Sequence, residues 1–189
     1  GAGDERRGPD RAWRKVTYGA ARDTVDRLTQ ALLELKLAAD RPVMILSGNS
    51  IEHALMVMAA MQARLPAAPV SVAYSLMSQE HATLKYVFDL LRPGLVLVQN
   101  AAMFERARRA LDLTDVTVVH VEQPVAGIAS RAYVELAATP VTPAVQASVE
   151  AITPDPIGKF LLTSGSTGTP KAVINTQKMM CANVAMGQQ

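Results

Sequence analysis

The sequence predicts an α/β fold with a mostly parallel sheet and flanking helices. Short apolar runs alternate with longer segments in which apolar residues recur every three or four positions. The runs lack polar alternation, as is typical of strands buried on both faces. The alternation of strands with helices builds βαβ units, whose crossovers are right-handed. Of the 189 residues, 49% are hydrophobic, so the chain can bury a core.

The chain is expected to open with a polar lead-in over residues 1–10, followed by a short strand at 13–18. A helix then opens at Thr17 or Tyr18 and runs toward Ala38. One apolar stripe at helical spacing defines its buried face. The stripe consists of Val25, Leu28, Leu32 and Leu35.

The next predicted unit is a buried strand over Val43–Leu46 followed by a helix that ends near Arg64. Asn49 and Glu52 have the spacing of a capping box, with Asn in place of the usual Ser or Thr. The helix is apolar on most faces, and its methionines are expected to fill the core. These are Met56, Met58 and Met61.

The same alternation continues to residue 121. The further predicted strands are 67–72, 95–98 and 116–121, and the further predicted helices are 79–91, capped by Ser78, and 101–111. After residue 137 the pattern fades and four prolines punctuate the chain. We therefore expect a first α/β lobe over residues 1–137, a linker over 138–156, and the start of a second lobe over 157–189.

A polar loop lies between two apolar segments, Phe160–Leu162 and Ala172–Ile174, which read as strands. Its glycines permit close backbone approach to a ligand, its amides can face an anion, and its hydroxyls and lysine add donors and charge. This chemistry predicts a phosphate cradle. The expected ligand-binding residues are Thr163, Ser164, Gly165, Ser166, Thr167, Gly168, Thr169, Pro170 and Lys171.

The loop has two alternative interpretations. In the P-loop of nucleotide triphosphatases, Gly precedes the lysine and Ser or Thr follows it. Here those positions hold Pro170 and Ala172, and Lys171 leads into a strand rather than a helix, so the P-loop is rejected. A plain hairpin turn is the other alternative, but a plain turn does not require nine such residues ending in Pro-Lys.

The loop resembles the phosphate-binding signature of the adenylate-forming superfamily, which comprises acyl- and aryl-CoA synthetases, luciferases and the adenylation domains of peptide synthetases. Phe160–Lys171 fits every position of that signature. The order of segments before the loop is similar as well, so the resemblance extends over most of residues 16–183. It implies that the chain is the amino-terminal lobe of such an enzyme.

Within the superfamily the chain looks most like feruloyl-CoA synthetases. The residues that carry this likeness are Lys159–Leu162 before the loop and Ala172–Gln177 after it. Many relatives have Gly at the position of Ala172 and His at the position of Gln177. These departures put in doubt any role borrowed from that histidine, but not phosphate binding.

The resemblance implies a ligase that uses ATP, Mg²⁺ and coenzyme A. The carboxylate of a small-molecule acid, here an aryl acid, would attack the α-phosphate to give acyl-AMP and pyrophosphate, and CoA would then displace AMP. The resemblance assigns the hydroxyls and the Gly165–Gly168 backbone to the β- and γ-phosphates. It makes Lys171 the catalytic cation, or an anchor of the loop.

Family members are around three times as long as this chain, and their later motifs have no counterpart here. The chain is therefore expected to be an amino-terminal fragment that is inactive alone. A non-catalytic nucleotide-binding module of the same fold is the alternative.

Composition argues against several other classes of protein. A net charge of +2 indicates no polyanionic partner, so nucleic acid binding is not expected. The single cysteine, Cys181, forms no intramolecular disulfide, and the three histidines lack metal-ligand spacing. No apolar run is long enough to span a bilayer. A cytoplasmic protein is expected.

Overall fold

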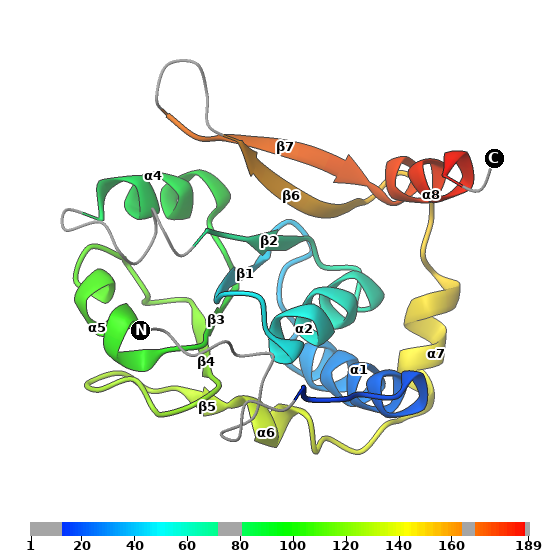
Figure 1. The fold of residues 1–189 in the computed structure, drawn as a ribbon, viewed down its shortest axis with the longest axis horizontal. Coiled ribbons are helices and arrows are strands. Elements are labelled where there is room, and N and C mark those ends of the chain that lie inside the picture. Colours follow the sequence, from blue (N-terminus) through cyan, green and yellow to red (C-terminus); the bar gives the residue numbers. More distant parts are fainter. Residues whose placement is uncertain (1–12, 72–80, 164–168, 188–189) are drawn as a thin grey trace.

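The computed structural model describes residues 13–71, 81–163 and 169–187 (Figure 1). In chain order the elements are α1 (Tyr18–Glu34), β1 (Val43–Leu46), α2 (Ile51–Gln62), β2 (Ala67–Pro69), α4 (Ala82–Leu91), β3 (Leu95–Val98), α5 (Ala101–Arg108), β4 (Thr117–His120), β5 (Arg131–Ala132), α6 (Tyr133–Leu136), α7 (Pro143–Glu150), β6 (Ile157–Thr163), β7 (Lys171–Thr176) and α8 (Gln177–Met186). Helices thus follow most strands, as predicted.

The described strands form one seven-stranded sheet in the order β5-β4-β3-β1-β2-β6-β7. All neighbouring pairs are parallel except β6 with β7. The predicted fold class, α/β with a mostly parallel sheet, is confirmed. The central strand β1 pairs in parallel with both β2 and β3, and all four of its residues are fully buried.

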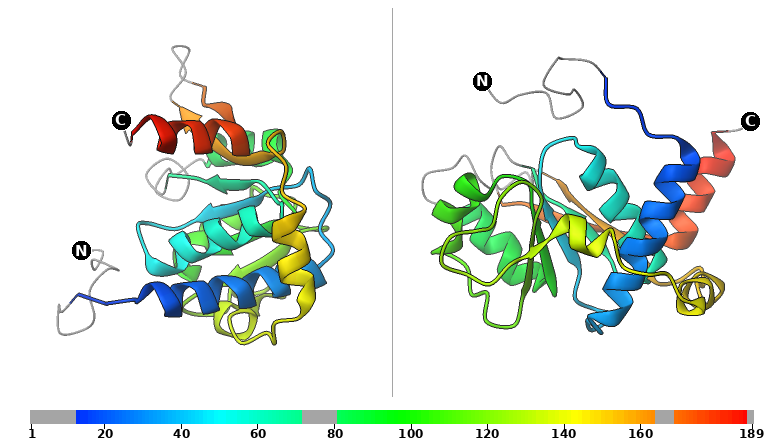
Figure 2. Two further views of the ribbon diagram at one scale, coloured as in Figure 1. Left: turned by 90° about the vertical axis from the view of Figure 1, so that its right-hand side faces the viewer. Right: turned by 90° about the horizontal axis from the view of Figure 1, so that it is seen from below.

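Helices cover both faces of the sheet (Figure 2). On one face, Val43 and Ile45 of β1 pack in a core with α1, α2 and α6. On the other, Met44 and Leu46 pack in a second core with α4 and α5. Successive strand residues point to opposite faces, so a short strand without polar residues supplies both cores.

Helix α1 forms because Thr17 caps it, with its hydroxyl oxygen 3.2 Å from the amide of Ala20. Val25, Leu28 and Leu32 of the predicted stripe are buried. The predicted end at Ala38 is wrong, because the helix stops at Glu34 and Lys36 takes a positive φ of 50°. A residue in that left-handed region cannot continue a right-handed helix.

The predicted strand at 13–18 is also wrong. Beyond a single bridge at Trp13, these residues form no strand before α1. The Arg14 guanidinium instead lies 2.7 Å from Glu52 Oε1. Burial would raise the pKa of Glu52, but the hydrogen bond from Arg14 helps to hold it below its ordinary value.

Glu52 is therefore not part of a capping box, and Asn49 is not the cap of α2. Ser50 is the N-cap, and its hydroxyl accepts a hydrogen bond from the His53 amide at 3.1 Å. Of the predicted core methionines, Met56 is fully buried, whereas Met58 is 42% exposed.

Several other predicted bounds differ from the structure. Helix α4 begins at Ala82 behind His81, and the predicted cap Ser78 lies outside the described residues. Helix α5 ends at Arg108 rather than at 111. Strand β5 and helix α6 were not predicted, because elements of two and four residues are too short to show a hydrophobic period.

The segment predicted as a linker contains helix α7, which is docked on α1 and α2. Gln30 Oε1 accepts from both the amide and the hydroxyl of Thr142, at 3.1 and 2.8 Å. Ser148 Oγ donates to the carbonyl of Gln62 at 2.8 Å. The division into two lobes with a boundary in this segment remains a prediction.

Replacing Gln30 tests this docking. Gln30→Ala leaves the amide and hydroxyl of Thr142 without their acceptor, so we expect the free energy of unfolding to fall by about 1–3 kcal/mol. Gln146, which bonds only Glu150 on the exposed side of α7, is the matched control, with an expected change within about 0.5 kcal/mol. Urea unfolding measures both; equal losses would contradict the docking role.

Candidate phosphate-binding site

The polar loop closes an antiparallel hairpin. Strands β6 and β7 lie side by side (Figure 1) and pair from Ile157↔Thr176 to Thr163↔Lys171, so the ends of the two strands that border the loop are held together. Strand β6 runs parallel to β2, which places the loop at the carboxyl edge of the sheet. Ligands of open α/β sheets bind outside that edge. Ser164, Gly165, Ser166, Thr167 and Gly168 lie outside the described residues.

The structure brings the two ends of the loop together. Thr163 and Lys171 are directly opposite each other in the ladder, and both are exposed. Thr169 is exposed, whereas Pro170 is buried, which holds the backbone in place directly before Lys171. Among the described residues Lys171 has no ion-pair partner, so its charge is free to meet an anion.

The two faces of the hairpin differ. Phe160, Leu162 and Ala172 pack against the core formed by α4 and α5. On the opposite face, Leu161 pairs with Val173, and these two side chains are 41% and 44% exposed. The pair Thr163 and Lys171 lies on this same face. The hairpin is therefore supported from one side, and the side that carries Lys171 is open.

The strand after the lysine confirms the rejection of the P-loop. Lys171 is the first residue of β7 rather than of a helix. The chain therefore lacks, after this lysine, the helix dipole that a P-loop provides. The later helix α8 begins at the opposite end of β7, capped by Thr176.

Sequence reasoning missed a polar network at the same edge of the sheet. Ser50 Oγ donates to Gln99 Oε1 at 3.3 Å, and Gln99 Nε2 donates to Glu122 Oε1 at 3.4 Å. This network joins the carboxyl ends of β1, β3 and β4. The crossover helices change face here, because α2 after β1 packs on one face of the sheet and α5 after β3 packs on the other.

His53 lies beside this network and is half-buried. Its Nδ1 is 2.8 Å from Ser47 Oγ and 3.1 Å from the carbonyl of Gly48. Ser47 Oγ also donates a hydrogen bond to the carbonyl of Gly48, at 3.1 Å. Burial lowers the pKa of His53, so the ring is neutral near pH 7.

The described residues contain no cluster of three His, Cys, Asp or Glu side chains able to hold a metal ion. Their helices include none with the length and apolar character needed to cross a bilayer.

Comparison with known proteins identifies related folds. A family model described as "AMP-binding enzyme" matches residues 5–189. No curated protein matches the chain at a significant level. Among solved structures, a luciferase-like enzyme from the mealworm Zophobas morio superposes with a TM-score of 0.74 at 14% identity, covering 96% of this chain and 40% of that one.

Two further structures have comparable similarity. A benzoate CoA ligase from Burkholderia xenovorans gives a TM-score of 0.69 at 17% identity, covering 90% of this chain and 30% of the ligase. ATP-bound MatB from Rhodopseudomonas palustris gives a TM-score of 0.66 at 20% identity, covering 92% of this chain and 32% of MatB. At these identities the likeness shows the fold alone, and the chain spans well under half the length of each relative.

The burial of His53 makes a prediction about pH. Its pKa is lower in the folded chain than in the unfolded chain, where it is about 6.5. Its contribution to stability is therefore complete above about pH 6.5 and is lost as the pH falls through the folded pKa. We expect His53→Gln to flatten the decline in unfolding free energy between about pH 7 and 5. Urea titrations at each pH measure this, and parallel curves for the two proteins would contradict it.

Proposed function

Because the chain belongs to the AMP-binding enzyme family, we propose that it takes part in the ATP-dependent activation of a carboxylic acid. The carboxylate oxygen attacks the α-phosphorus of ATP, the bond to the β-phosphate bridging oxygen breaks, and acyl-AMP and pyrophosphate result. The observation that carries this proposal is the Thr163–Lys171 loop, which closes a hairpin at the carboxyl edge of the sheet within a family match over nearly the whole chain.

The proposed roles follow from the charges in this step. Pyrophosphate accumulates negative charge as it leaves, and preorganised donors stabilise such charge. We assign the hydroxyls of Ser164, Ser166, Thr167 and Thr169 to the β- and γ-phosphates, together with the Gly165–Gly168 backbone. Lys171, exposed and without an ion-pair partner among the described residues, supplies the positive charge.

Mg²⁺ would enter bound to ATP, where it neutralises phosphate charge. The loop's donors suit the phosphate oxygens that the ion leaves uncoordinated. Buried Pro170 fixes the backbone at the base of the loop, while the glycines let the loop close on ATP and open for pyrophosphate release.

Coenzyme A is the proposed acceptor in a second step, in which its thiolate attacks the acyl carbon and AMP leaves. The residues Lys159–Leu162 and Ala172–Gln177 support an aryl acid of the feruloyl type, and the fold shared with a benzoate CoA ligase is compatible with it. We place the reaction in the cytoplasm, where ATP and CoA are available.

The first test separates phosphate binding from thioester formation. In the full-length gene product, we expect Lys171→Ala to slow pyrophosphate release roughly 10- to 100-fold. Ser166→Ala should slow it up to about 10-fold, because a neutral hydrogen-bond donor contributes less than a charged one. Lys178→Ala, a charge removed from the exposed surface of α8, is the matched control and should change little.

Synthetic acyl-AMP supplied with CoA measures the second step alone. Lys171→Ala should affect it less, because pyrophosphate is already absent. An equal slowing of both steps would show that the loop does not act chiefly on the ATP phosphates.

The second test concerns the 189 residues by themselves. The chain spans 30–40% of the three relatives described above, so we propose that it supplies the amino-terminal, phosphate-binding part of the enzyme. We expect it to bind ATP, detected by calorimetry, without releasing pyrophosphate. Turnover by this chain at about 1 per second or faster, a rate typical of enzymes, would contradict the expectation. If the gene-encoded protein also binds ATP without turnover, the chain is a non-catalytic nucleotide-binding module instead.

A further inference from the structure

The joint between the hairpin and the other strands is the weakest pairing in the described sheet. Strand β1 pairs with β2 at three positions and with β3 at four, and β6 pairs with β7 at six. Among the described residues, β2 and β6 pair at one position alone, Ala67↔Lys159. Figure 1 shows the hairpin diverging from β2 toward the end that carries the loop. Backbone pairing with β2 therefore fixes the base of β6 but not its far end.

Pro69 explains why this pairing stops. The amide of Val70 donates to the carbonyl of Ile45 on β1 at 3.0 Å. Backbone groups alternate in direction along a strand, so those of Pro69 face β6 instead. Proline has no amide hydrogen, so β2 lacks a donor at the position where the ladder beyond Ala67 would continue. A single residue thus limits the joint to one pair.

Helix α8 is bound to the root of the hairpin. The amide of Lys178 donates to the carbonyl of Pro154 at 2.9 Å. Met180 lies against Gly158, where an added side chain would collide with it. Strands β6 and β7 are also paired with each other at six positions. We call the two strands and α8, described over residues 157–163 and 169–186, the hairpin unit.

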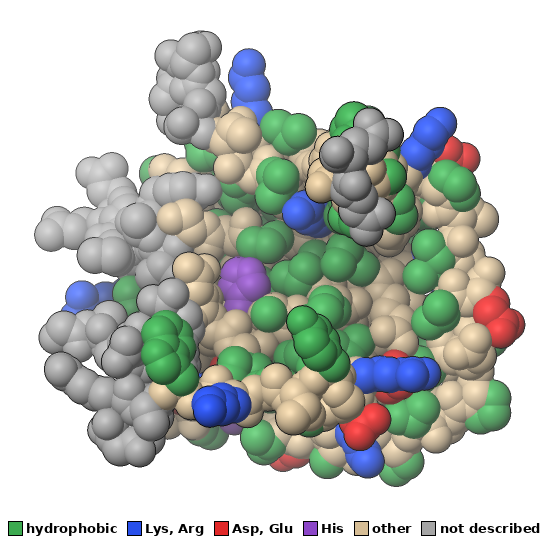
Figure 3. Space-filling view, turned by 45° about the vertical axis from the view of Figure 1, so that its right-hand side comes forward, with side chains coloured by type: hydrophobic (Ala, Val, Ile, Leu, Met, Phe, Trp, Pro, Cys, Tyr) green, Lys and Arg blue, Asp and Glu red, His purple; other side chains and the backbone are tan. Residues whose placement is uncertain are grey.

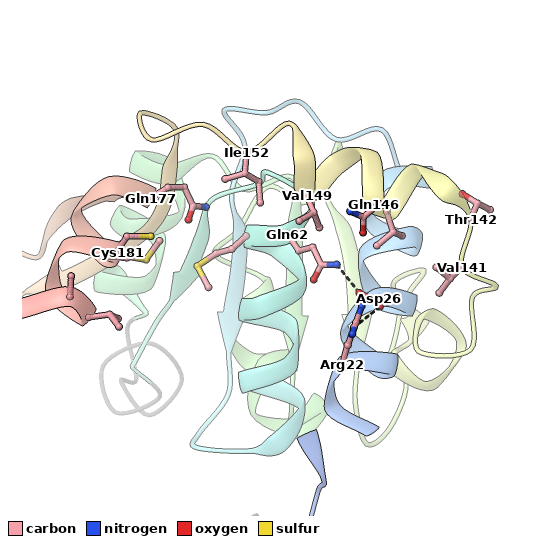
Figure 4. Close-up of a pocket in the computed structure, with 15 residues that line it drawn as sticks. Arg22, Asp26, Gln62, Val141, Thr142, Gln146, Val149, Ile152, Gln177 and Cys181 are labelled. Carbon is pink, nitrogen blue, oxygen red and sulfur yellow. Dashed lines mark hydrogen bonds and ion pairs between the residues drawn. The ribbon is translucent and has the colours of Figure 1, made fainter. Parts of the chain in front are cut away.

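A cleft separates the hairpin unit from α1, α2 and α7. It has a volume of about 830 Å³ (Figure 4). Figure 4 shows Gln177 and Cys181 of α8 on one side of it, with Gln62 of α2 and Val149 of α7 on the other. No residue of α8 is buried, and hydrophobic side chains stay uncovered over this side of the molecule (Figure 3). The hairpin unit therefore has room to move on this side.

The remaining attachments of the hairpin unit are adaptable. Phe160, Leu162 and Ala172 pack against the core formed by α4 and α5, but all three remain partly exposed. The segment that leads from α7 into the unit, residues 153–156, is exposed throughout. Apolar contacts are non-directional, so these side chains can slide on the core. A longer ladder of backbone hydrogen bonds would instead fix the angle between β6 and β2.

We propose that the hairpin unit pivots as one body about the Ala67–Lys159 pair. Thr163 lies four residues beyond the pivot, about 13 Å along an extended strand. A rotation of about 15° therefore moves Thr163 and Lys171 by about 3 Å, which is the length of a hydrogen bond. The pivot deepens the proposed function and rests on it for its purpose, which is to bring the loop onto the ATP phosphates and to withdraw it for pyrophosphate release.

Pairs of spin labels measure this motion in the 189-residue chain, with Cys181→Ser removing the single native thiol. Labels at the exposed positions Arg27 on α1 and Val173 on β7 report the place of the hairpin. We expect their distance distribution to be at least about twice as broad as that between Arg27 and Leu90 on α4. The distribution between Val173 and Val184 on α8 should be narrow, because both positions lie in one body.

Replacing Pro69 tests the cause of the motion. Pro69→Ala supplies the missing amide on β2, so the Arg27–Val173 distribution should narrow toward the width of the Arg27–Leu90 control. Pro140→Ala, which removes a proline from the exposed connection between α6 and α7, is the matched control and should leave the width unchanged. Slow hydrogen exchange at the amide introduced at position 69 would show independently that it pairs with β6.

Three results would overturn the pivot. The first is a hairpin distribution as narrow as the Arg27–Leu90 control, and the second is a width that Pro69→Ala leaves unchanged. The third is a Val173–Val184 distribution as broad as the one across the joint, which would mean that the hairpin frays instead of moving as one body.

Adding ATP separates the pivot from the phosphate-binding proposal. We expect ATP to narrow the Arg27–Val173 distribution and Lys171→Ala to remove that effect while the width without ATP stays the same. A distribution that is broad without ATP and unchanged by ATP contradicts phosphate binding and supports the pivot. A distribution that is narrow under both conditions contradicts the pivot, whatever calorimetry finds for ATP binding.

Discussion

The parallel pairing of β1 with both of its neighbours is the constraint on which the other parts of the structure depend. Its four residues are fully buried and alternate between two cores, one with α1 and α2 and one with α4 and α5. Neither helical layer could bury its apolar stripe without this strand. Because β2 and β6 run in the same direction as β1, the carboxyl ends of these strands share one edge. The polar loop is placed at that edge by β6, so the location of the site follows from strand direction.

Much of this architecture can be predicted from local sequence. The runs Val43–Leu46 and Leu95–Val98 are strands with the predicted bounds, because apolar residues without alternation fit only a strand buried on both faces. Helix starts at Tyr18 and Gln177 follow from the caps Thr17 and Thr176. These signals are local, and the structure preserves them.

The wrong predictions share one cause. At these positions, contacts between residues distant in sequence determine the local structure. Residues 13–17 have β-forming composition, but Arg14 pairs with a carboxylate on α2 instead. The same pair removes Glu52 from the capping box that its spacing suggests. Helix α7 is too short to show a period, and its polar side chains are stabilised by Gln30 and Gln62 on other helices. The network of Ser50, Gln99 and Glu122 could not be predicted either, because only the strand order brings these residues together.

The short strand β2 has a consequence for the assembly of the sheet. Between synthesis of β2 and synthesis of β6, the β2 side of the sheet has no partner strand, and an unpaired edge is a template for aggregation. Strand β2 presents only Ala67–Pro69, and its last residue has no amide hydrogen to donate. While it is open, this edge is thus a poor template for a foreign strand. Its native partner arrives as a hairpin, whose local contacts form within microseconds, so the strand that carries the loop can dock already paired on its outer side.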